Sequence, residues 1–160
     1  MKLERVEKKD IKGLALLASE IWHEYWPCIL TSEQIDYMVD KFQSENAIIN
    51  QIENENYTYY FLKVDEKTAG YTGVSDCKDY LFLSKLYIKK EFRHKGLGKK
   101  AFEEIKKLGF NRIQLTVNKY NKNTIDAYLK YGFKIIDKAV TDIGNGFVMD
   151  DYIMEFTLTD

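Results

Sequence analysis

The stretch "LYIKKEFRHKGLGKK", residues 86–100, decides which fold this chain adopts. Apolar residues end a predicted strand, and two glycines then stand among basic residues where a helical pattern begins. Glycine lets backbone N–H groups approach an anion closely, and the start of a helix offers unpaired N–H groups and a partial positive charge. The loop, with Arg93, Lys95 and Lys99 as added cations, therefore has the features of a pyrophosphate-binding site.

Two other glycine-loop motifs fit this stretch less well. A Walker A loop requires glycine at the position of Arg93 and serine or threonine at that of Lys100. A dinucleotide-binding fingerprint matches Gly96, Gly98 and Ala101, but it should follow its strand at once, with an acid about 20 residues further on. Here a loop intervenes and that acid is missing. An ordinary strand-to-helix connection with solubilising basic residues stays open as an alternative.

Outward from this loop, the spacing of apolar residues predicts one α/β domain over residues 1–160. Asp10 and Asn121 are expected to cap helices, and Thr31 with Gln34 forms a capping-box pattern. The predicted order is βαααβββαβαββ: strand 2–6, helices after Asp10, after Thr31 and at 47–52, strands 57–64, 68–75 and 80–88, a helix after Gly98, strand 112–117, helix 121–131, and strands 133–140 and 147–158. Strands 80–88 and 112–117 flank one helix, so they should run parallel.

The composition is that of a globular protein, with 160 residues, 45% of them hydrophobic and 31% charged. No apolar run approaches the ~18 residues that cross a bilayer, and the N-terminus lacks the apolar region of a signal peptide, so we expect a cytoplasmic protein without membrane contact. Cys28 and Cys77 are isolated, as free cysteines are. His23 and His94 have no metal-ligand spacing, so no metal is expected.

The net charge of −1 conceals a segregation of charge along the chain. Residues 85–107 hold nine Lys and Arg against three acids, whereas residues 13–57 hold eight acids and one base. Residues 139–160 hold five acids and no base. Such blocks are either solvated faces or sites for an anionic cofactor and a cationic substrate. A basic region confined to one loop and helix does not favour nucleic-acid binding.

The glycine loop and a second motif together resemble the GNAT N-acetyltransferase superfamily. Arg93, Gly96 and Gly98 fill the acetyl-CoA loop pattern Q/R-x-x-G-x-G/A, and Lys90 stands where many members have proline. The stretch "VNKYNKNTIDAYLKYGF", residues 117–133, resembles V-x-x-x-N-x-x-A-x-x-x-Y-x-x-x-G-F, with Thr124 in place of alanine as a small-for-small change. The resemblance covers residues 2–158, loosely favours the bacterial polyamine acetyltransferase branch, and implies a mixed sheet of about seven strands flanked by helices.

The resemblance implies acetyl-CoA as the cofactor. Two parallel strands would splay apart at a bulge, and the pantetheine arm would pair with the main chain of Leu86, Tyr87 and Ile88. Asn121, and more weakly Asn123, would bind the cofactor near that arm. The pyrophosphate would be held by the N–H groups of the loop, which comprises Arg93, His94, Lys95, Gly96, Leu97, Gly98 and Lys99.

The family's chemistry is direct attack of an amine on the thioester. A strand N–H near Leu86 or Tyr87 would stabilise the oxyanion. Tyr128 stands at the family's acid position, where a phenol of pKa ~10 would protonate the leaving thiolate, although a tyrosine on an amphipathic helix is also an ordinary core residue. The base that accepts the amine proton is left unassigned among four residues: His23, Glu24, Asp150 and Asp151.

The segment "IWHEYWPC", residues 21–28, occupies the family's acceptor side. Trp22, Tyr25 and Trp26 are expected to line a pocket that favours cations, with Asp150 as a further acceptor-binding residue. The sequence therefore predicts a small-molecule or peptide amine as acceptor, polyamine-like in charge, and is compatible with a homodimer through the terminal strands. A non-catalytic acyl-CoA-binding module is the alternative.

Overall fold

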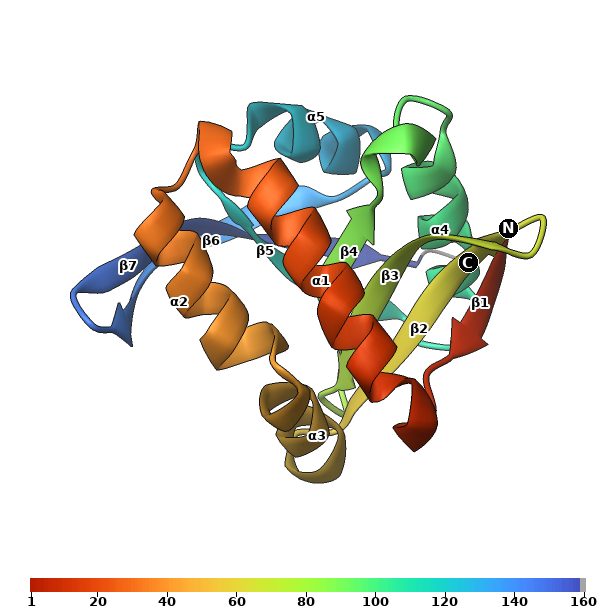
Figure 1. The fold of residues 1–160 in the computed structure, drawn as a ribbon. Helices are drawn as coiled ribbons and strands as arrows, with labels where there is room; N and C mark the ends of the chain where they lie inside the picture. Colours follow the sequence, from red (N-terminus) through yellow and green to blue (C-terminus); the bar gives the residue numbers. More distant parts are fainter. Residues whose placement is uncertain (159–160) are drawn as a thin grey trace.

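The computed structural model describes residues 1–158, so positions 159 and 160 of the predicted domain lie outside the described residues. Within the described part, seven strands form one mixed sheet in the order β1-β2-β3-β4-β5-β7-β6 (Figure 1). The strands are β1 (Lys2–Arg5), β2 (Tyr57–Val64), β3 (Lys67–Asp76), β4 (Leu81–Ile88), β5 (Arg112–Asn118), β6 (Lys134–Gly144) and β7 (Phe147–Thr157). The α-helices are α1 (Ile11–Tyr25), α2 (Ser32–Gln43), α3 (Glu45–Asn54), α4 (Leu97–Lys106) and α5 (Lys122–Lys130). The predicted element order and the parallel pairing of β4 with β5 are confirmed.

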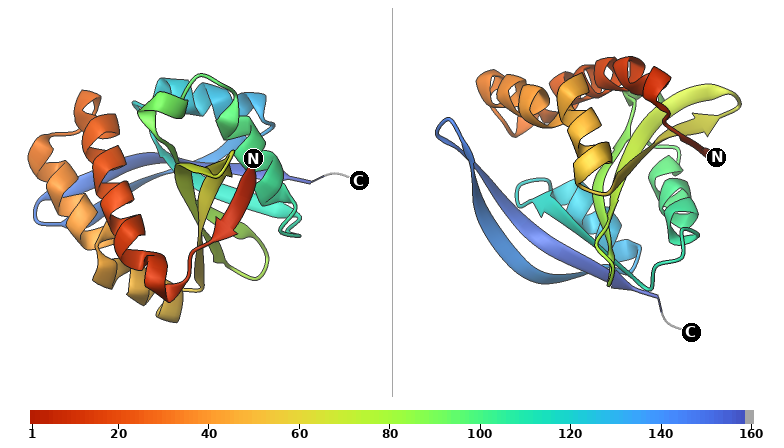
Figure 2. Two further views of the ribbon diagram at one scale, coloured as in Figure 1. Left: turned by 45° about the vertical axis from the view of Figure 1, so that its right-hand side comes forward. Right: turned by 90° about the horizontal axis from the view of Figure 1, so that it is seen from below.

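Helices cover both faces of the sheet (Figure 2). On one side, which we call the α4/α5 face, Phe102 of α4 and Tyr128 of α5 pack with Leu83 of β4, Leu115 of β5 and Met154 of β7. The opposite side, the α1–α3 face, carries α1, α2 and α3. The α4/α5 face has one apolar cluster and the α1–α3 face has two, and the sheet separates them.

A chain of buried hydrogen bonds fixes α1, α2 and α3 against the sheet. Trp22 Nε1 donates to the Tyr71 hydroxyl at 2.7 Å, and that hydroxyl donates to Gln43 Oε1 at 2.6 Å. Gln43 Nε2 donates to the Tyr59 hydroxyl at 3.1 Å, which in turn donates to Gln51 Oε1 at 2.6 Å. Since buried polar groups are costly when unpaired, this satisfied chain specifies how the helices dock.

Strand β4 contains a bulge at Ser84. Gly73 of β3 pairs with Lys85, whereas the next residue, Val74, pairs with Leu83, so Ser84 has no partner in the ladder. A bulge shifts the alternation of side chains by one position. Ser84 and Lys85 therefore both reach the α1–α3 face.

Strands β4 and β5 separate soon after they meet. They pair only at Leu81 with Ile113 and at Phe82 with Gln114. From the bulge onward the β5-facing edge of β4 has no ladder partner in the described chain, which leaves a gap in the middle of the sheet. The predicted splaying of these strands at a bulge is therefore present in the structure.

Local capping departs from prediction at the first two helices. Thr31 caps α2 as expected, because its side chain accepts from Gln34 N at 3.2 Å, but the Gln34 side chain donates to Val148 O at 3.3 Å and does not complete the box. The prediction for Asp10 is wrong: its carboxylate accepts from Glu7 N at 3.0 Å and makes no cap to α1. The Asp10 side chain instead caps the 3-10 turn that precedes α1.

The C-terminal hairpin is longer than predicted, with β6 reaching Gly144 in place of position 140. Asn145 and Gly146 both have positive φ, 54° and 79°, as a two-residue hairpin turn of Asn-Gly type requires. Helix α2 holds the tip, because the Tyr37 hydroxyl donates to Ile143 O at 2.7 Å. Helix α2 is thereby fixed over the end of the sheet that carries β6 and β7.

Candidate active site

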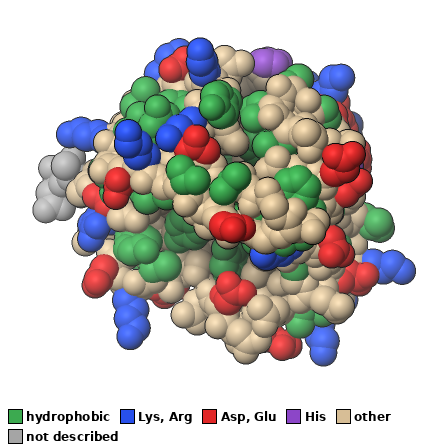
Figure 3. Space-filling view, turned by 90° about the vertical axis from the view of Figure 1, so that its left-hand side faces the viewer, with side chains coloured by type: hydrophobic (Ala, Val, Ile, Leu, Met, Phe, Trp, Pro, Cys, Tyr) green, Lys and Arg blue, Asp and Glu red, His purple; other side chains and the backbone are tan. Residues whose placement is uncertain are grey.

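A cavity of about 1260 Å³ lies at the gap between β4 and β5 and is lined by residues from both faces of the sheet. Seen from the side in Figure 3, hydrophobic side chains lie in the hollowed middle of the surface, with Asp and Glu side chains around it. Within residues 1–158, no cluster of His, Cys, Asp and Glu could hold a metal ion, and no helix is long and apolar enough to span a membrane.

The start of α4 forms one end of the cavity. Gly96 is the N-cap with φ +74°, and no side chain caps the helix there. A Cβ on Gly98 would come within 3.3 Å of the Tyr131 hydroxyl, so a side chain at that position would crowd the loop. The first N–H groups of α4 therefore have no side-chain partner and can bind an anion, which fits the diphosphate of coenzyme A.

Arg93 connects this loop to α1. Its Nη1 lies 2.6 Å from Glu24 Oε1, its Nε donates to Ile88 O at 2.9 Å, and its guanidinium carbon lies 5.1 Å from the Tyr25 ring centroid. Nη2 is buried without a hydrogen-bond partner among the described residues. The Arg93 charge is thus partly compensated by Glu24, and one donor is left for an anion.

Most of the residues predicted for the site line this cavity. The exceptions are Lys95, Lys99 and Asp150. Lys95 Nζ lies 5.8 Å from the ring centroid of Phe92, and Lys99 is exposed on α4. Asp150 Oδ1 lies 2.7 Å from Lys119 Nζ. The two lysines add positive charge near the loop without lining the cavity. Asp150 is paired with Lys119 and does not line the cavity either.

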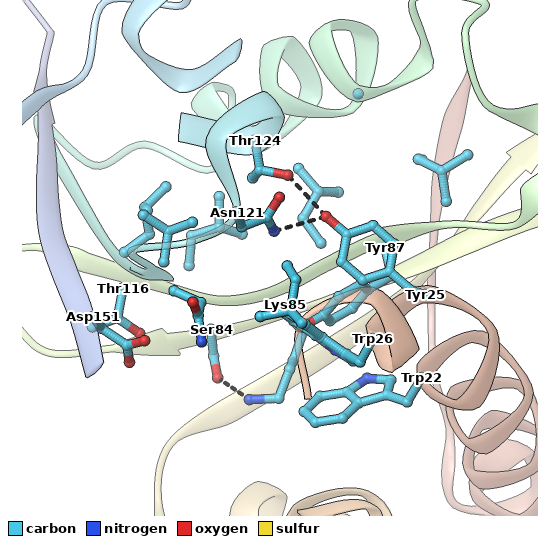
Figure 4. A pocket seen from close by; sticks show the side chains of 18 of the residues that line it. Trp22, Tyr25, Trp26, Ser84, Lys85, Tyr87, Thr116, Asn121, Thr124 and Asp151 are labelled. Carbon is cyan, nitrogen blue, oxygen red and sulfur yellow. Dashed lines mark hydrogen bonds between the residues drawn. The ribbon is translucent and has the colours of Figure 1, made fainter. Parts of the chain in front are cut away.

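Asn121 links α5 to α1 (Figure 4). It was predicted as an N-cap, but its side chain makes no cap; its Nδ2 donates to the Tyr25 hydroxyl at 2.7 Å. That hydroxyl is also 2.9 Å from Thr124 Oγ1. The replacement of alanine by Thr124 therefore has a structural consequence that the sequence did not suggest, because it adds a second hydrogen bond between the two helices.

Tyr128 lines the cavity from the α4/α5 face and is only 8% exposed. Its ring is held edge-on against Tyr131 and Phe133, with centroids 5.8 and 5.2 Å away. Burial raises the pKa of Tyr128 above its usual value, and the neighbouring Tyr131 and Tyr25 add to this. The phenol therefore keeps its proton at neutral pH and has it available to donate.

An aromatic wall closes the cavity on the α1–α3 face. The Tyr87 ring centroid lies 5.5 Å from that of Trp22, 5.8 Å from that of Tyr25 and 6.4 Å from that of Trp26. Trp26 Nε1 is buried and makes no hydrogen bond with the described residues. Because Trp22 uses its own N–H within the core, the wall offers ring faces and one free indole donor.

The bulge adds two polar residues that the sequence reading missed. Lys85 Nζ donates to Ser84 Oγ at 2.6 Å, and the Tyr57 hydroxyl donates to the same oxygen at 2.8 Å. Burial lowers the pKa of Lys85 to about 8, which the charge of Glu55 only partly offsets. A signal was present: two consecutive polar residues interrupt the apolar strand "YLFLSKLYI", as a bulge would require.

Asp151 enters the cavity from β7 and is 6% exposed. Its Oδ1 is buried and has no hydrogen-bond partner among the described residues. Burial raises the pKa of the Asp151 carboxyl to about 6; Asp150 raises it further, and Lys119 opposes the rise. The predicted site contained its neighbour Asp150, whereas the structure directs Asp151 into the cavity.

The other carboxylates and the imidazole considered as bases are already engaged. His23 Nε2 lies 2.6 Å from Asp36 Oδ1 on the surface, and the pKa of His23 is raised, chiefly by that hydrogen bond. Glu24 lines the cavity but is paired with Arg93. His23 does not line the cavity, and the charge of Glu24 is compensated by Arg93.

Comparison with known proteins agrees with this geometry. Residues 18–133 match the family model described as Acetyltransferase (GNAT) family. The chain is 27% identical over 158 residues to a spermidine N(1)-acetyltransferase of Thermoplasma acidophilum, covering 94% of this chain and 96% of that protein. It is 26% identical over 157 residues to an uncharacterised N-acetyltransferase of Lactobacillus delbrueckii subsp. lactis, covering 91% of each.

A solved structure shares the fold along its whole length. The PaiA N-acetyltransferase of Thermoplasma acidophilum, determined in complex with coenzyme A, superposes with a TM-score of 0.75 at 25% identity, covering 98% of this chain and 99% of that one. The chain therefore belongs to the GNAT acetyltransferase family. It is an acetyltransferase, and its cofactor is acetyl-CoA.

Proposed function

We propose that this protein transfers an acetyl group from acetyl-CoA to a primary amine by direct attack within a ternary complex, and that the acceptor is a polyamine-like cation or a peptide amine. The observation that carries the proposal is a single cavity passing through the sheet. It joins the uncapped start of α4 and Tyr128 on one face to an aromatic and acidic lining on the other.

Acetyl-CoA, when bound, supplies the activated acetyl thioester. The N–H groups at the start of α4 hold the diphosphate, together with the free Nη2 of Arg93. The unpaired edge of β4 at Leu86 to Ile88 offers main-chain groups to the pantetheine arm and an N–H to the developing oxyanion. Tyr128, whose phenol is neutral at pH 7, gives its proton to the departing sulfur.

The lining of the α1–α3 face supports a cationic acceptor. Ring faces of Trp26 and Tyr87 attract cations, and the carboxylates of Asp151 and Glu55 lie on the same side. A relative of this chain is named as acting on spermidine. Lys85 is a cation in this part of the cavity, so the charged nitrogens of the acceptor must lie toward the carboxylates and away from Lys85.

A thiol-release assay with acetyl-CoA and a panel of amines tests the proposal. The panel contains spermidine, spermine and putrescine, a lysine-containing peptide, an aminoglycoside, and free amino acids whose carboxylate makes them zwitterionic. We expect kcat/KM for the polyamines or the peptide amine to exceed that for the zwitterions by about tenfold or more. A preference for neutral or anionic acceptors would contradict the acceptor class. Tight coenzyme A binding without thiol release for any amine would favour the binding-module alternative.

The homodimer remains a prediction. Strand β6 is the edge of the sheet, and its exposed apolar side chains include Ile135, Ile136 and Val140. Sedimentation of the purified protein would test it.

A further inference from the structure

Asp151 lies on the acceptor side of the sheet gap. In the ladder between β5 and β7 it pairs with Asn118, two residues from Thr116, and Figure 4 shows Asp151 beside Thr116 at the edge of the cavity. The neighbouring residues of β7, Tyr152 and Met154, belong to the apolar cluster of the α4/α5 face. Side chains alternate along a strand, so Asp151 projects to the opposite face.

This carboxylate is costly to the fold. A buried acid with an unpaired oxygen destabilises the folded state, because its charged form is desolvated without compensation. Leucine at this position would avoid that cost, and asparagine would avoid the part that comes from the charge. Such unfavourable placements concentrate where a reaction needs them.

We propose that Asp151 is the general base of the reaction, and that its free Oδ1 accepts a proton from the acceptor nitrogen. The assignment rests on the proposed function and deepens it, since it names the residue that readies the amine for attack. Tyr128 lines the same cavity from the opposite face. Base and acid are thus separated by the gap between β4 and β5, which keeps them from neutralising each other.

The protons balance with these two residues. A primary ammonium carries three N–H protons and the amide product keeps one. One of the other two passes to Asp151, and then to solvent, before the nitrogen attacks, because an ammonium nitrogen has no lone pair with which to form the C–N bond. The other ends on the sulfur of released coenzyme A, through the Tyr128 hydroxyl, as the C–S bond breaks.

The surrounding charges suit a base at neutral pH. Burial is the main cause that raises the pKa of Asp151 to about 6. Asp150, on the same strand, raises this pKa further, and Lys119, before α5, lowers it. From the other elements, the charged or titratable residues that line the cavity are Glu24 of α1, Lys41 of α2, Glu55, Lys85 of β4, Arg93, His94 and Lys122. Asp151 is then ionised at pH 7 and still far more basic than an ordinary aspartate.

The first test needs no substrate. Because the folded-state pKa of Asp151 is raised above its unfolded value, the wild-type protein loses stability as pH rises through about 6, and Asp151→Asn does not. Melting of the apo proteins should show Tm values that converge as the pH falls toward about 3.8, and an advantage of about 3–6 °C for Asp151→Asn at pH 8. Asp137→Asn, an exposed aspartate on β6, is the matched control and should follow the wild type. Parallel curves for all three proteins would overturn the proposal.

The second test is the pH profile of kcat/KM with the best amine of the panel. For the wild type, kcat/KM should rise with pH up to an apparent pKa near 6 and stay constant above it. For Asp151→Asn, kcat/KM should show no plateau and should rise with the fraction of the amine that is unprotonated. Its kcat/KM should therefore be roughly 10²–10³-fold below that of the wild type at pH 7, and this difference should shrink about tenfold per pH unit. Coenzyme A affinity should be unchanged.

The outcomes separate the two proposals. A wild-type protein that acetylates no amine refutes the proposed function. An active wild type whose profile lacks the limb near pH 6, or a variant whose deficit is the same at every pH, refutes only the role of Asp151. The wild-type profile alone decides this even if the variant folds poorly.

Discussion

The two faces of the sheet encode their parts of the site in different ways. On the cofactor side, most of the lining residues come from two stretches of the sequence, 86–98 and 117–133, although the Tyr87 ring lies on the opposite face. On the α1–α3 face, the lining is assembled from separate residues of α1, α2, α3, β2, β4 and β7. The cofactor side can be recognised from sequence motifs, whereas the residues of the acceptor side come together only when the chain folds.

The difference follows from what each face must recognise. A diphosphate is held largely by main-chain N–H groups at a helix start, and a short local sequence with glycines is enough to build that geometry. An amine acceptor is held by side chains whose spacing depends on how helices dock on the sheet. Substitutions should therefore act in distinct ways on the two faces, and three of them test this.

The largest effect is expected for Tyr128→Phe, on the α4/α5 face. The ring packing is kept and the proton donor is lost, so kcat should fall by roughly 10²–10³-fold while the coenzyme A Kd stays unchanged. Steady-state kinetics and calorimetry measure the two quantities. Tyr152→Phe, packed against the same cluster but outside the cavity lining, is the control. Equal turnover for both variants would remove Tyr128 from the chemistry.

A smaller effect is expected for Gly96→Ala in the loop. A side chain at φ +74° costs about 1–2 kcal/mol and shifts the N–H groups that face the diphosphate, so the coenzyme A Kd should rise about tenfold. Gly109→Ala is the matched control, because φ is +95° there and a Cβ would also enter open space. Both variants should lose similar stability in denaturant unfolding. Equal coenzyme A affinity in the two would show that the loop does not bind the diphosphate.

The smallest effect is expected for Lys85→Met, on the α1–α3 face. Removing a like charge from the cavity should favour a polyamine by about 1 kcal/mol, roughly a fivefold decrease in KM at pH 7. The pKa of Lys85 is lowered to about 8, so the wild type loses this charge above pH 8 and the advantage of the variant should vanish there. Lys138→Met, exposed on β6, is the control. An advantage that persists at pH 9.5 would mean that packing, not charge, is responsible.

The errors of the sequence reading have a common physical origin. Asp10, Asn121 and Thr124 were each assigned from local pattern, a cap in two cases and a neutral replacement in the third. In the structure, the Asp10 carboxylate accepts a hydrogen bond within the turn that precedes α1. Asn121 and Thr124 both form hydrogen bonds with Tyr25, which is 96 residues from Asn121 in the sequence. A short polar side chain has several partners within reach, and tertiary contacts choose among them.

The sequence by itself determined the order of helices and strands, the parallel β4–β5 pair, and the glycine loop at the start of α4. Apolar periodicity, turn residues and main-chain geometry depend on a few neighbouring residues, so they can be predicted from the sequence alone. Only the tertiary structure decided that Asp151, not Asp150, enters the cavity, and that Ser84 and Lys85 face the acceptor side. Strand alternation and a one-residue bulge set those directions, and burial then set the protonation of the groups.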